Sequence, residues 1–235
     1  MSVEVRAKVG VVVVAAGNSI RYRPNTQKLL ETIAPGIPVI ASTLFALKRS
    51  NLIHCYALVV SKEIEKHIQD LAGKILAQSP YQIIRGGLSR QESVYLGLQS
   101  LPQKVNYVLV HDGARPLPSV ELIKRVIEAT TLSGAAVPVV AVTNTIKHAR
   151  NNEIVKTVPR EGLFEAQTPQ GFSYQDLVDA HLKARQLELN TTDDAELIEK
   201  TLKSKIVTCE GDPDNIKITV PADLRLARLI YKERL

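Results

Sequence analysis

The chain has 235 residues, 45% of them hydrophobic, and its 30 Lys and Arg against 24 Asp and Glu give a formal net charge of +6. This hydrophobic share supports a core, and no run nears the roughly 20 apolar residues of a membrane helix, so we expect a cytoplasmic globular protein with no membrane partner. Nucleic-acid binders cluster basic residues with aromatic side chains, whereas only 4% of this chain is aromatic and its basic residues are dispersed. The charge favours a small phosphorylated ligand over nucleic acid.

Short β-branched runs alternate with helical periodicity over the first 140 residues. The run at residues 8–17 is continuously apolar, as expected for a central parallel strand buried on both faces. We predict further strands at 55–60, 81–84, 107–111 and 135–140, and helices at 39–49, 64–76, 91–101 and 120–131. This alternation predicts an α/β fold with a Rossmann-like, doubly wound, mostly parallel sheet that binds its ligand at the carboxyl ends of the strands.

The alternation breaks at residues 142–158. Two polar strands, at 145–150 and 153–158, flank the turn residues Asn151 and Asn152 and predict a protruding β-hairpin. An isolated hairpin is marginally stable, so we expect this arm to pack against a second subunit. Helices at 174–185, 194–200 and 221–234 and a strand at 205–209 follow. No repeat or linker divides the chain, so we predict a single domain, residues 1–235, with a dimerisation arm at about 142–158.

The first predicted strand ends in the sequence AAG at residues 15–17, and Arg21 and Lys28 follow. Small residues let a ligand approach backbone N–H groups that bind phosphate, and the two cations can reach the same anion. Gly17 has no glycine two residues on and no Gly-Lys-Ser/Thr follows, so this is neither a dinucleotide motif nor a P-loop. Taken alone, the motif fits a solvated surface loop equally well.

Two other motifs follow predicted strands. In HDGARP at 111–116, Asp112 can hold Mg²⁺ on a nucleotide and Arg115 can bind phosphate; the alternative is a structural Asp–Arg pair in a turn. We expect His111 to be a packing histidine. In GGLSRQES at 86–93, Ser93 either caps the following helix or meets a nucleobase edge.

Six motifs in this order and spacing, over about residues 9–229, resemble the 2-C-methyl-D-erythritol 4-phosphate cytidylyltransferase family. They are AAG at 15–17 with Arg21 and Lys28, GG at 86–87 with Ser93, HDGARP at 111–116, QTPQ at 167–170, TDDA at 192–195 and DNIKIT at 214–219. The resemblance implies an enzyme of the non-mevalonate isoprenoid pathway that joins CTP to a polyol phosphate and releases pyrophosphate. The related family that makes CDP-ribitol is the near alternative, and a non-catalytic nucleotide-binding regulatory protein is the alternative of another class.

The resemblance also implies residue roles, with Mg²⁺ as cofactor. Ala15, Ala16, Gly17, Asn18, Gly87, Ser93 and Asp112 would bind CTP, with Asp112 beside the metal. Arg21, Lys28, Arg160 and Lys217 would be catalytic, and Arg115, Thr145, Thr168 and Thr192 would surround the polyol phosphate. The hairpin is similar to the family's dimer arm, which implies a homodimer in which Thr145 and Arg160 serve the partner's site.

The sequence departs from the family pattern at three positions. Ser19 replaces a usual glycine, Gln27 stands where proline is frequent, and Leu88 replaces an acidic residue after the second glycine. The Leu88 side chain cannot accept a hydrogen bond from the cytosine amino group. Cytosine selection is therefore expected to depend on backbone groups and Ser93.

Overall fold

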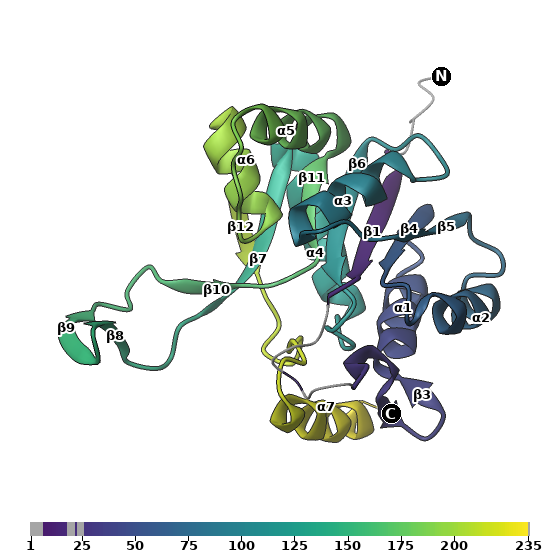
Figure 1. Cartoon of the computed structure of the whole chain (residues 1–235), viewed down its shortest axis with the longest axis horizontal. Helices are drawn as coiled ribbons and strands as arrows, with labels where there is room; N and C mark the ends of the chain where they lie inside the picture. The colour runs from purple at the N-terminus through teal and green to yellow at the C-terminus, as the bar shows by residue number, and fades with distance from the viewer. Residues whose placement is uncertain (1–6, 18–21, 23–25, 235) are drawn as a thin grey trace.

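The computed structural model describes residues 7–17, 22 and 26–234. These residues contain an eight-stranded sheet with the strand order β10-β7-β11-β6-β1-β4-β5, in which β12 also pairs with β7 (Figure 1). The strands are β1 (Val9–Ala15), β4 (Cys55–Val60), β5 (Tyr81–Arg85), β6 (Tyr107–Asp112), β7 (Ala135–Ala141), β10 (Phe164–Ala166), β11 (Gln170–Ser173) and β12 (Val207–Glu210). β1 pairs in parallel with β4 and β6, and β4 with β5, whereas β10 and β11 run antiparallel to their neighbours. The predicted doubly wound, mostly parallel sheet is confirmed.

Helices cover both faces of the sheet because the central strand is apolar on both sides. Val11 and Val13 of β1 belong to one core cluster with residues of α1 (Val39–Arg49), α2 (Glu65–Ile75), α4 (Val120–Ser133) and α7 (Pro221–Glu233). Val12, between them, belongs to a second cluster with α3 (Arg90–Gln99), α5 (Tyr174–Gln186) and α6 (Asp194–Leu202). Successive residues of a strand point to opposite faces, so an unbroken valine run requires two covering layers. No helix among the described residues is long and apolar enough to cross a membrane.

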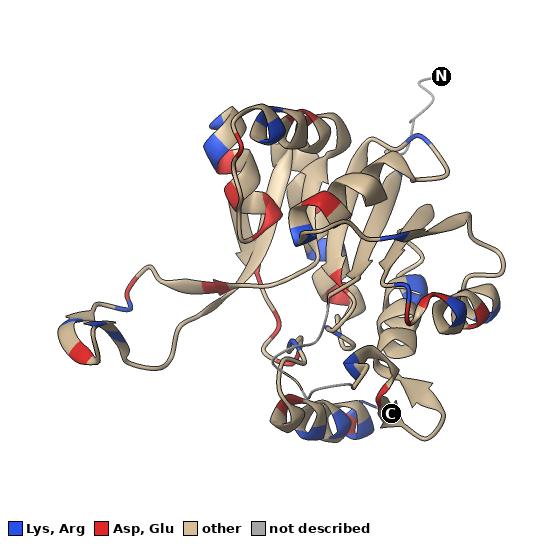
Figure 2. Ribbon diagram, in the orientation of Figure 1, with Lys and Arg blue, Asp and Glu red and all other residues tan. Residues whose placement is uncertain are grey.

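The predicted hairpin is present as β8 (Ile146–Arg150) and β9 (Glu153–Val158), and it extends away from the sheet (Figure 1). Its turn residues Asn151 and Asn152 have φ values of 51° and 66°, the left-handed region that asparagine tolerates in tight hairpin turns. Ile154 and Val155 on β9 are 66% and 58% exposed. The arm thus exposes these apolar side chains to solvent in the single chain, next to the Lys and Arg residues that Figure 2 shows in the arm.

Sequence reasoning missed the small hairpin of β2 (Thr32–Ala34) and β3 (Ile37–Pro38), the 3-10 helix η1 (Lys28–Leu30), and strands β10 and β11. β10 and β11 have three and four residues and surround the QTPQ motif, whose Thr168–Pro169 bond is cis. Strands this short carry little periodicity of their own and form because β6 and β7 offer them open edges. The last predicted strand, at 205–209, begins two residues later and ends one residue later, at Val207–Glu210.

The order of the strands places a crevice beside β1. From β1 the chain moves outward through β4 to β5 and then returns to β6, on the other side of β1. In open α/β sheets, ligands bind outside the carboxyl ends of the strands at such a reversal. The carboxyl ends of β1 and β6 are therefore where a binding site is expected.

Candidate active site

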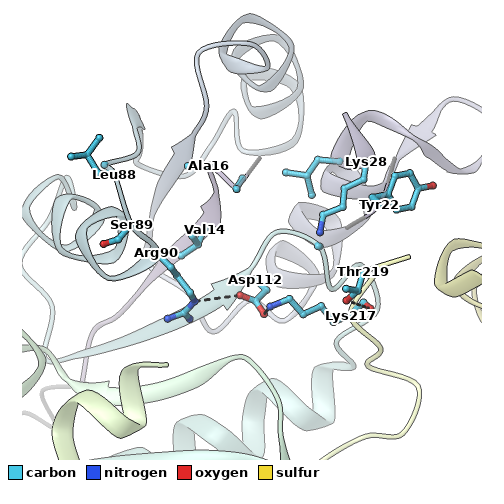
Figure 3. A pocket seen from close by; sticks show the side chains of 15 residues that line it. Val14, Ala16, Tyr22, Lys28, Leu88, Ser89, Arg90, Asp112, Lys217 and Thr219 are labelled. Atoms are coloured by element: carbon cyan, nitrogen blue, oxygen red, sulfur yellow. Dashed lines mark hydrogen bonds and ion pairs between the residues drawn. The ribbon is translucent and has the colours of Figure 1, made fainter. Parts of the chain in front are cut away.

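A cavity of about 420 Å³ opens at the carboxyl ends of β1 and β6 (Figure 3). Its described lining is Val14, Ala15, Ala16, Gly17, Tyr22, Lys28, Leu29, Gly87, Leu88, Ser89, Arg90, Asp112, Ala114, Lys217 and Thr219. Seven predicted site residues are thus brought together: Ala15, Ala16, Gly17, Lys28, Gly87, Asp112 and Lys217. Asn18 and Arg21, which were also predicted, lie outside the described residues.

The glycine turn, residues 86–89, packs directly against the end of β1. A Cβ atom on Gly86 would lie 2.3 Å from the Cβ of Ala16, so any side chain there would push the two segments apart. Glycine at this position lets the backbone of the turn approach the AAG segment. The cavity between them is consequently walled by backbone and small side chains, which suits a planar base or a phosphate.

Ser93 lies beneath the glycine turn and is 2% exposed. Its Oγ accepts a hydrogen bond from the Gly87 N–H at 3.1 Å and donates to the Ser89 carbonyl at 2.8 Å. The helix-capping role considered for Ser93 was wrong, because the side chain of Ser89 caps α3 by accepting from the Glu92 N–H at 3.0 Å. Ser93 does not line the cavity, and its contact with cytosine stays a prediction.

Leu88 is fully exposed at the rim of the cavity. Its backbone N–H donates to Glu92 Oε2 at 2.7 Å, which fixes the turn through the main chain. The fully exposed side chain therefore has no structural role in the turn.

A cluster of charges centres on Asp112, the last residue of β6. Its carboxylate lies 2.8 Å from Lys217 Nζ, 3.7 Å from Arg115 Nε and 3.8 Å from Arg90 Nε. Burial alone would raise the pKa of Asp112, but Lys217, Arg90 and Arg115 outweigh burial and hold the pKa well below its usual range. Asp112 is therefore a carboxylate at every physiological pH.

Arg115 does not line the cavity. It donates through Nη1 to the Asn215 carbonyl at 2.6 Å and through Nη2 to the Ala166 carbonyl at 3.4 Å. Burial lowers the pKa of the guanidinium, although Asp112 opposes that shift. In the single chain Arg115 thus forms the structural pair with Asp112 that was the alternative interpretation of HDGARP. Through its bonds to the Asn215 and Ala166 carbonyls it also holds together two segments next to the cavity.

Thr168 holds the backbone of Asp112 in place and, like Arg115, does not belong to the described lining of the cavity. Its Oγ1 accepts from the Asp112 N–H at 3.1 Å and lies 3.2 Å from His111 Nδ1. His111 Nε2 lies 3.1 Å from the Arg115 carbonyl, which can only accept, so Nε2 carries the proton and Nδ1 accepts from Thr168. Burial lowers the pKa of His111 to about 4, so the ring is neutral and packs as predicted.

Two lysines approach the cavity from separate segments (Figure 3). Lys28 is the first residue of η1, and its Nζ donates to the Ile218 carbonyl at 3.0 Å. Lys217 precedes Ile218 in an irregular segment, residues 211–219, called here the 211–219 loop. This arrangement directs positive charge at the space between the AAG segment and Asp112, where an anionic ligand would be stabilised.

Arg90 was missed by sequence reasoning although it stands in the same motif as the glycine turn. It is the first residue of α3, lines the cavity, and binds Asp194 with Nη1 2.8 Å from Oδ2. Burial alone would lower the pKa of Arg90, yet Asp194 and Asp112 raise it. Arg90 could have been predicted by the argument that was applied to Arg21, because both are cations that follow a glycine. The pairing of Arg90 with Asp194 could not have been predicted, because Asp194 lies far along the chain.

Three further predicted residues, Arg160 as a catalytic residue and Thr145 and Thr192 as substrate-binding residues, lie elsewhere in the single chain. Thr145 and Arg160 belong to the arm region, where Arg160 donates to the Thr143 carbonyl. Thr192 is exposed, and its backbone N–H and hydroxyl both donate to Glu196 Oε2. None of the three lines the cavity, so a role for them at this site requires either a second chain or a bound substrate.

The donor set fits Mg²⁺ only together with a ligand. Among the described residues no group of three or more His, Cys, Asp and Glu side chains could hold a metal ion, and Asp112 is the single carboxylate in the described lining. Mg²⁺ in nucleotide sites is held by one or two carboxylates plus phosphate oxygens. Asp112 suits that arrangement, with the nucleotide phosphates supplying the other oxygens.

The fold and the site together indicate the class of protein. A doubly wound sheet with a cationic cavity at the strand reversal, a backbone-walled slot and one ionised carboxylate is the construction of a nucleotide-using transferase. The family model described as 2-C-methyl-D-erythritol 4-phosphate cytidylyltransferase matches residues 9–233, and the chain belongs to this family.

Individual relatives agree with that membership. Proteins named 2-C-methyl-D-erythritol 4-phosphate cytidylyltransferase from Microcystis aeruginosa and Crocosphaera subtropica are 40% and 39% identical to this chain, each over 94% of it and over 97% and 96% of their own lengths. A solved structure of that name from Thermus thermophilus has a TM-score of 0.80 and 32% identity, covering 96% of this chain and 99% of the other. A 4-diphosphocytidyl-2C-methyl-D-erythritol synthase from Anaerococcus prevotii has a TM-score of 0.82 and 27% identity over the same shares.

Proposed function

We propose that this chain joins CTP to 2-C-methyl-D-erythritol 4-phosphate, producing 4-diphosphocytidyl-2-C-methyl-D-erythritol and pyrophosphate. The observation that carries the proposal is the family match over residues 9–233, combined with a cavity at the strand reversal that is lined by Lys28, Lys217 and Asp112. The relatives that bear this name cover nearly the whole chain. The family match favours this reaction over the ribitol phosphate alternative.

The reaction requires little acid–base chemistry from the protein. An oxygen of the polyol phosphate, already anionic at neutral pH, attacks the α-phosphorus of CTP, and the bond from that phosphorus to the bridging oxygen breaks as pyrophosphate leaves. Two anions must approach each other, so the barrier depends on positioning and on positive charge. Lys28 and Lys217 enter the cavity from separate segments and can offset that repulsion, and we assign Arg21 the same role.

The remaining assignments follow the walls of the cavity. The AAG segment and the glycine turn would bind the base and phosphates of CTP through backbone groups. Asp112 would hold Mg²⁺ against the triphosphate. Mg²⁺ bound there would neutralise phosphate charge and stabilise the departing pyrophosphate. Lys217, which pairs with Asp112 at 2.8 Å in the single chain, would be available to the incoming phosphate if Asp112 held Mg²⁺ instead.

We further propose a cytoplasmic homodimer whose arms complete the partner's substrate site. The arm exposes the apolar side chains of Ile154 and Val155, and exposure of apolar surface to water is unfavourable. Thr145 and Arg160 lie outside the described lining of the cavity of their own chain. Reciprocal exchange of arms forms a two-fold interface. Such an arrangement brings Arg160 and Thr145 to the polyol phosphate from the neighbouring subunit.

The test is pyrophosphate release with CTP and each of two polyol phosphates, methylerythritol 4-phosphate and ribitol 5-phosphate, with Mg²⁺ or with EDTA. We expect rapid release only with methylerythritol phosphate and Mg²⁺. Faster release with ribitol phosphate would transfer the assignment to the CDP-ribitol reaction. CTP binding without release with either acceptor would support a non-catalytic nucleotide-binding protein.

A further inference from the structure

We propose that Arg234, after the last turn of α7, is a positioning residue: it fixes the two segments that carry Arg115 and Lys217 relative to each other. Arg234 does not belong to the described lining of the cavity, and no motif in the sequence pointed to it. The inference rests on the proposed function, because Lys217, on one of the two segments, is assigned there to the incoming phosphate.

One guanidinium reaches both segments. Arg234 Nη1 donates to the Leu117 carbonyl at 2.8 Å, two residues after Arg115. Its Nη2 lies 3.0 Å from Asp214 Oδ2 and 3.3 Å from Asp212 Oδ2, both in the 211–219 loop. A single planar group therefore connects the turn after β6 to the loop that carries Lys217.

The 211–219 loop needs such tethers because it contains no helix or strand. Asp214 N–H donates to Asp212 Oδ1 at 3.0 Å, so the two carboxylates that Arg234 contacts are already locked into one turn. Fixing that turn fixes the chain three residues before Lys217. Other tethers act further along, including the Ile218 N–H bond to the Ala114 carbonyl at 2.9 Å. Loss of Arg234 should thus loosen the loop without releasing it.

The expected consequence is kinetic more than thermodynamic. The Arg234 side chain is 33% exposed, and partly exposed ion pairs contribute little to stability. Displacing a phosphate-binding lysine by a fraction of its reach can nevertheless cost between about tenfold and a hundredfold in rate, because transfer depends on alignment. Arginine is suited to this task since its planar fork presents two nitrogens in fixed directions to a carbonyl and a carboxylate, whereas lysine has a single ammonium nitrogen.

The experiment compares Arg234→Ala, Arg234→Lys and Asp214→Asn with wild type and with Arg225→Ala, an exposed arginine on the same helix. We expect Arg234→Ala to lower kcat/KM for the polyol phosphate about tenfold while the KM for CTP changes less than twofold. Arg234→Lys should recover part of that loss, and Arg225→Ala should match wild type. The double variant Arg234→Ala with Asp214→Asn should be no worse than the poorer single variant, because both changes break the same link.

A second readout does not use activity. Amide hydrogen exchange within residues 211–219 and 115–118 should accelerate in Arg234→Ala and not in Arg225→Ala. Wild-type kinetics and wild-type exchange in Arg234→Ala would overturn the inference, as would a fall in melting temperature with unchanged kinetics. An inactive wild-type enzyme would refute the proposed function instead, and the exchange experiment would still decide whether Arg234 holds the loop.

Discussion

Lys217 Nζ lies 2.8 Å from Asp112 Oδ2, so the one carboxylate in the described lining of the cavity is paired before any ligand arrives. Two arginines, Arg90 and Arg115, also lie within 3.8 Å of the same carboxylate. A metal ion must therefore compete with cations of the protein for Asp112. The pair holds Lys217 at the cavity, where the proposed mechanism requires positive charge.

The first prediction concerns Asp112→Asn. Asparagine keeps the shape but removes the charge that would hold Mg²⁺, so we expect kcat to fall about a hundredfold and the Mg²⁺ concentration for half-maximal rate to rise. Titration of Mg²⁺ in the pyrophosphate assay measures both. Asp70→Asn, an exposed position on α2, is the control. An unchanged Mg²⁺ dependence in Asp112→Asn would show that the metal is held elsewhere.

The second prediction concerns His181, a buried side chain on α5 that faces Asp194, Arg90, Arg185 and Tyr95. Burial, followed by Arg90 and Arg185, lowers the pKa of His181 to about 4, and Asp194, with Oδ1 3.8 Å away, does not reverse that shift. The folded state therefore prefers neutral imidazole, while the unfolded chain takes up a proton near pH 6.5. The contribution of His181 to the free energy of unfolding is therefore fully present above pH 6.5. It is lost as the pH falls towards 4, and the loss is roughly 3 kcal/mol at most.

Replacement of His181 should reduce this loss of stability at acidic pH. The free energy of unfolding, measured by urea denaturation, is plotted against pH between 6.5 and 4. The slope for His181→Gln should be smaller than that of wild type by the equivalent of about one proton taken up on unfolding. His67→Gln, at an exposed position on α2, should keep the wild-type slope. If the His181→Gln slope equals that of wild type, His181 is not a neutral buried group.

The third prediction concerns cytosine selection. The Leu88 side chain projects into solvent, so Leu88→Ala should leave the ratio of kcat/KM for CTP to that for UTP within about twofold of wild type. Ser93→Ala removes the two hydrogen bonds that the Ser93 hydroxyl makes to the glycine turn and should weaken binding of CTP by about tenfold. A wild-type ratio near unity would contradict selection by backbone groups.

These residues show how far the sequence reaches. The valine run of β1 can be predicted because a strand buried on both faces leaves an unbroken apolar signal, and motifs at strand ends then place Lys28 and Asp112 at one edge. Lys217 was placed there only by the family resemblance. The pair of Arg90 with Asp194 depends on how α3 meets the start of α6, which no local pattern encodes. Likewise, Ser93 was interpreted from its place near a helix start, whereas the direction of its hydroxyl is set by the fold of the glycine turn.

The fourth prediction separates catalysis from stability at Lys28. Lys28→Ala should lower kcat at least a hundredfold but shift the melting temperature by no more than a few degrees, because the part-buried bond from Lys28 Nζ to the Ile218 carbonyl lies outside the core. Circular dichroism melts and the pyrophosphate assay measure the two effects. Lys62→Ala, on an exposed loop after β4, is the matched control. Parallel losses of stability and rate, with CTP affinity intact, would make Lys28 structural.

The last prediction tests the shared site by mixing inactive chains. Arg160 lies outside the cavity of its own chain, whereas Lys28 and Lys217 line one cavity together. If arms are exchanged, a heterodimer of Lys28→Ala and Arg160→Ala has one site with both groups intact. Random re-association of equal amounts should then restore about one quarter of wild-type activity, since half of the dimers are mixed and half of their sites are complete.

The control for that experiment is a mixture of Lys28→Ala with Lys217→Ala. Because both lysines belong to one chain's cavity, each site of this heterodimer lacks one of them, and re-association should restore nothing. Gel filtration or sedimentation of the wild-type protein should give a dimer of about 52 kDa, twice the 25.8 kDa of one chain. An active monomer, or a mixture of Lys28→Ala with Arg160→Ala that stays as inactive as its parents, would show that Arg160 acts within its own chain or not at all.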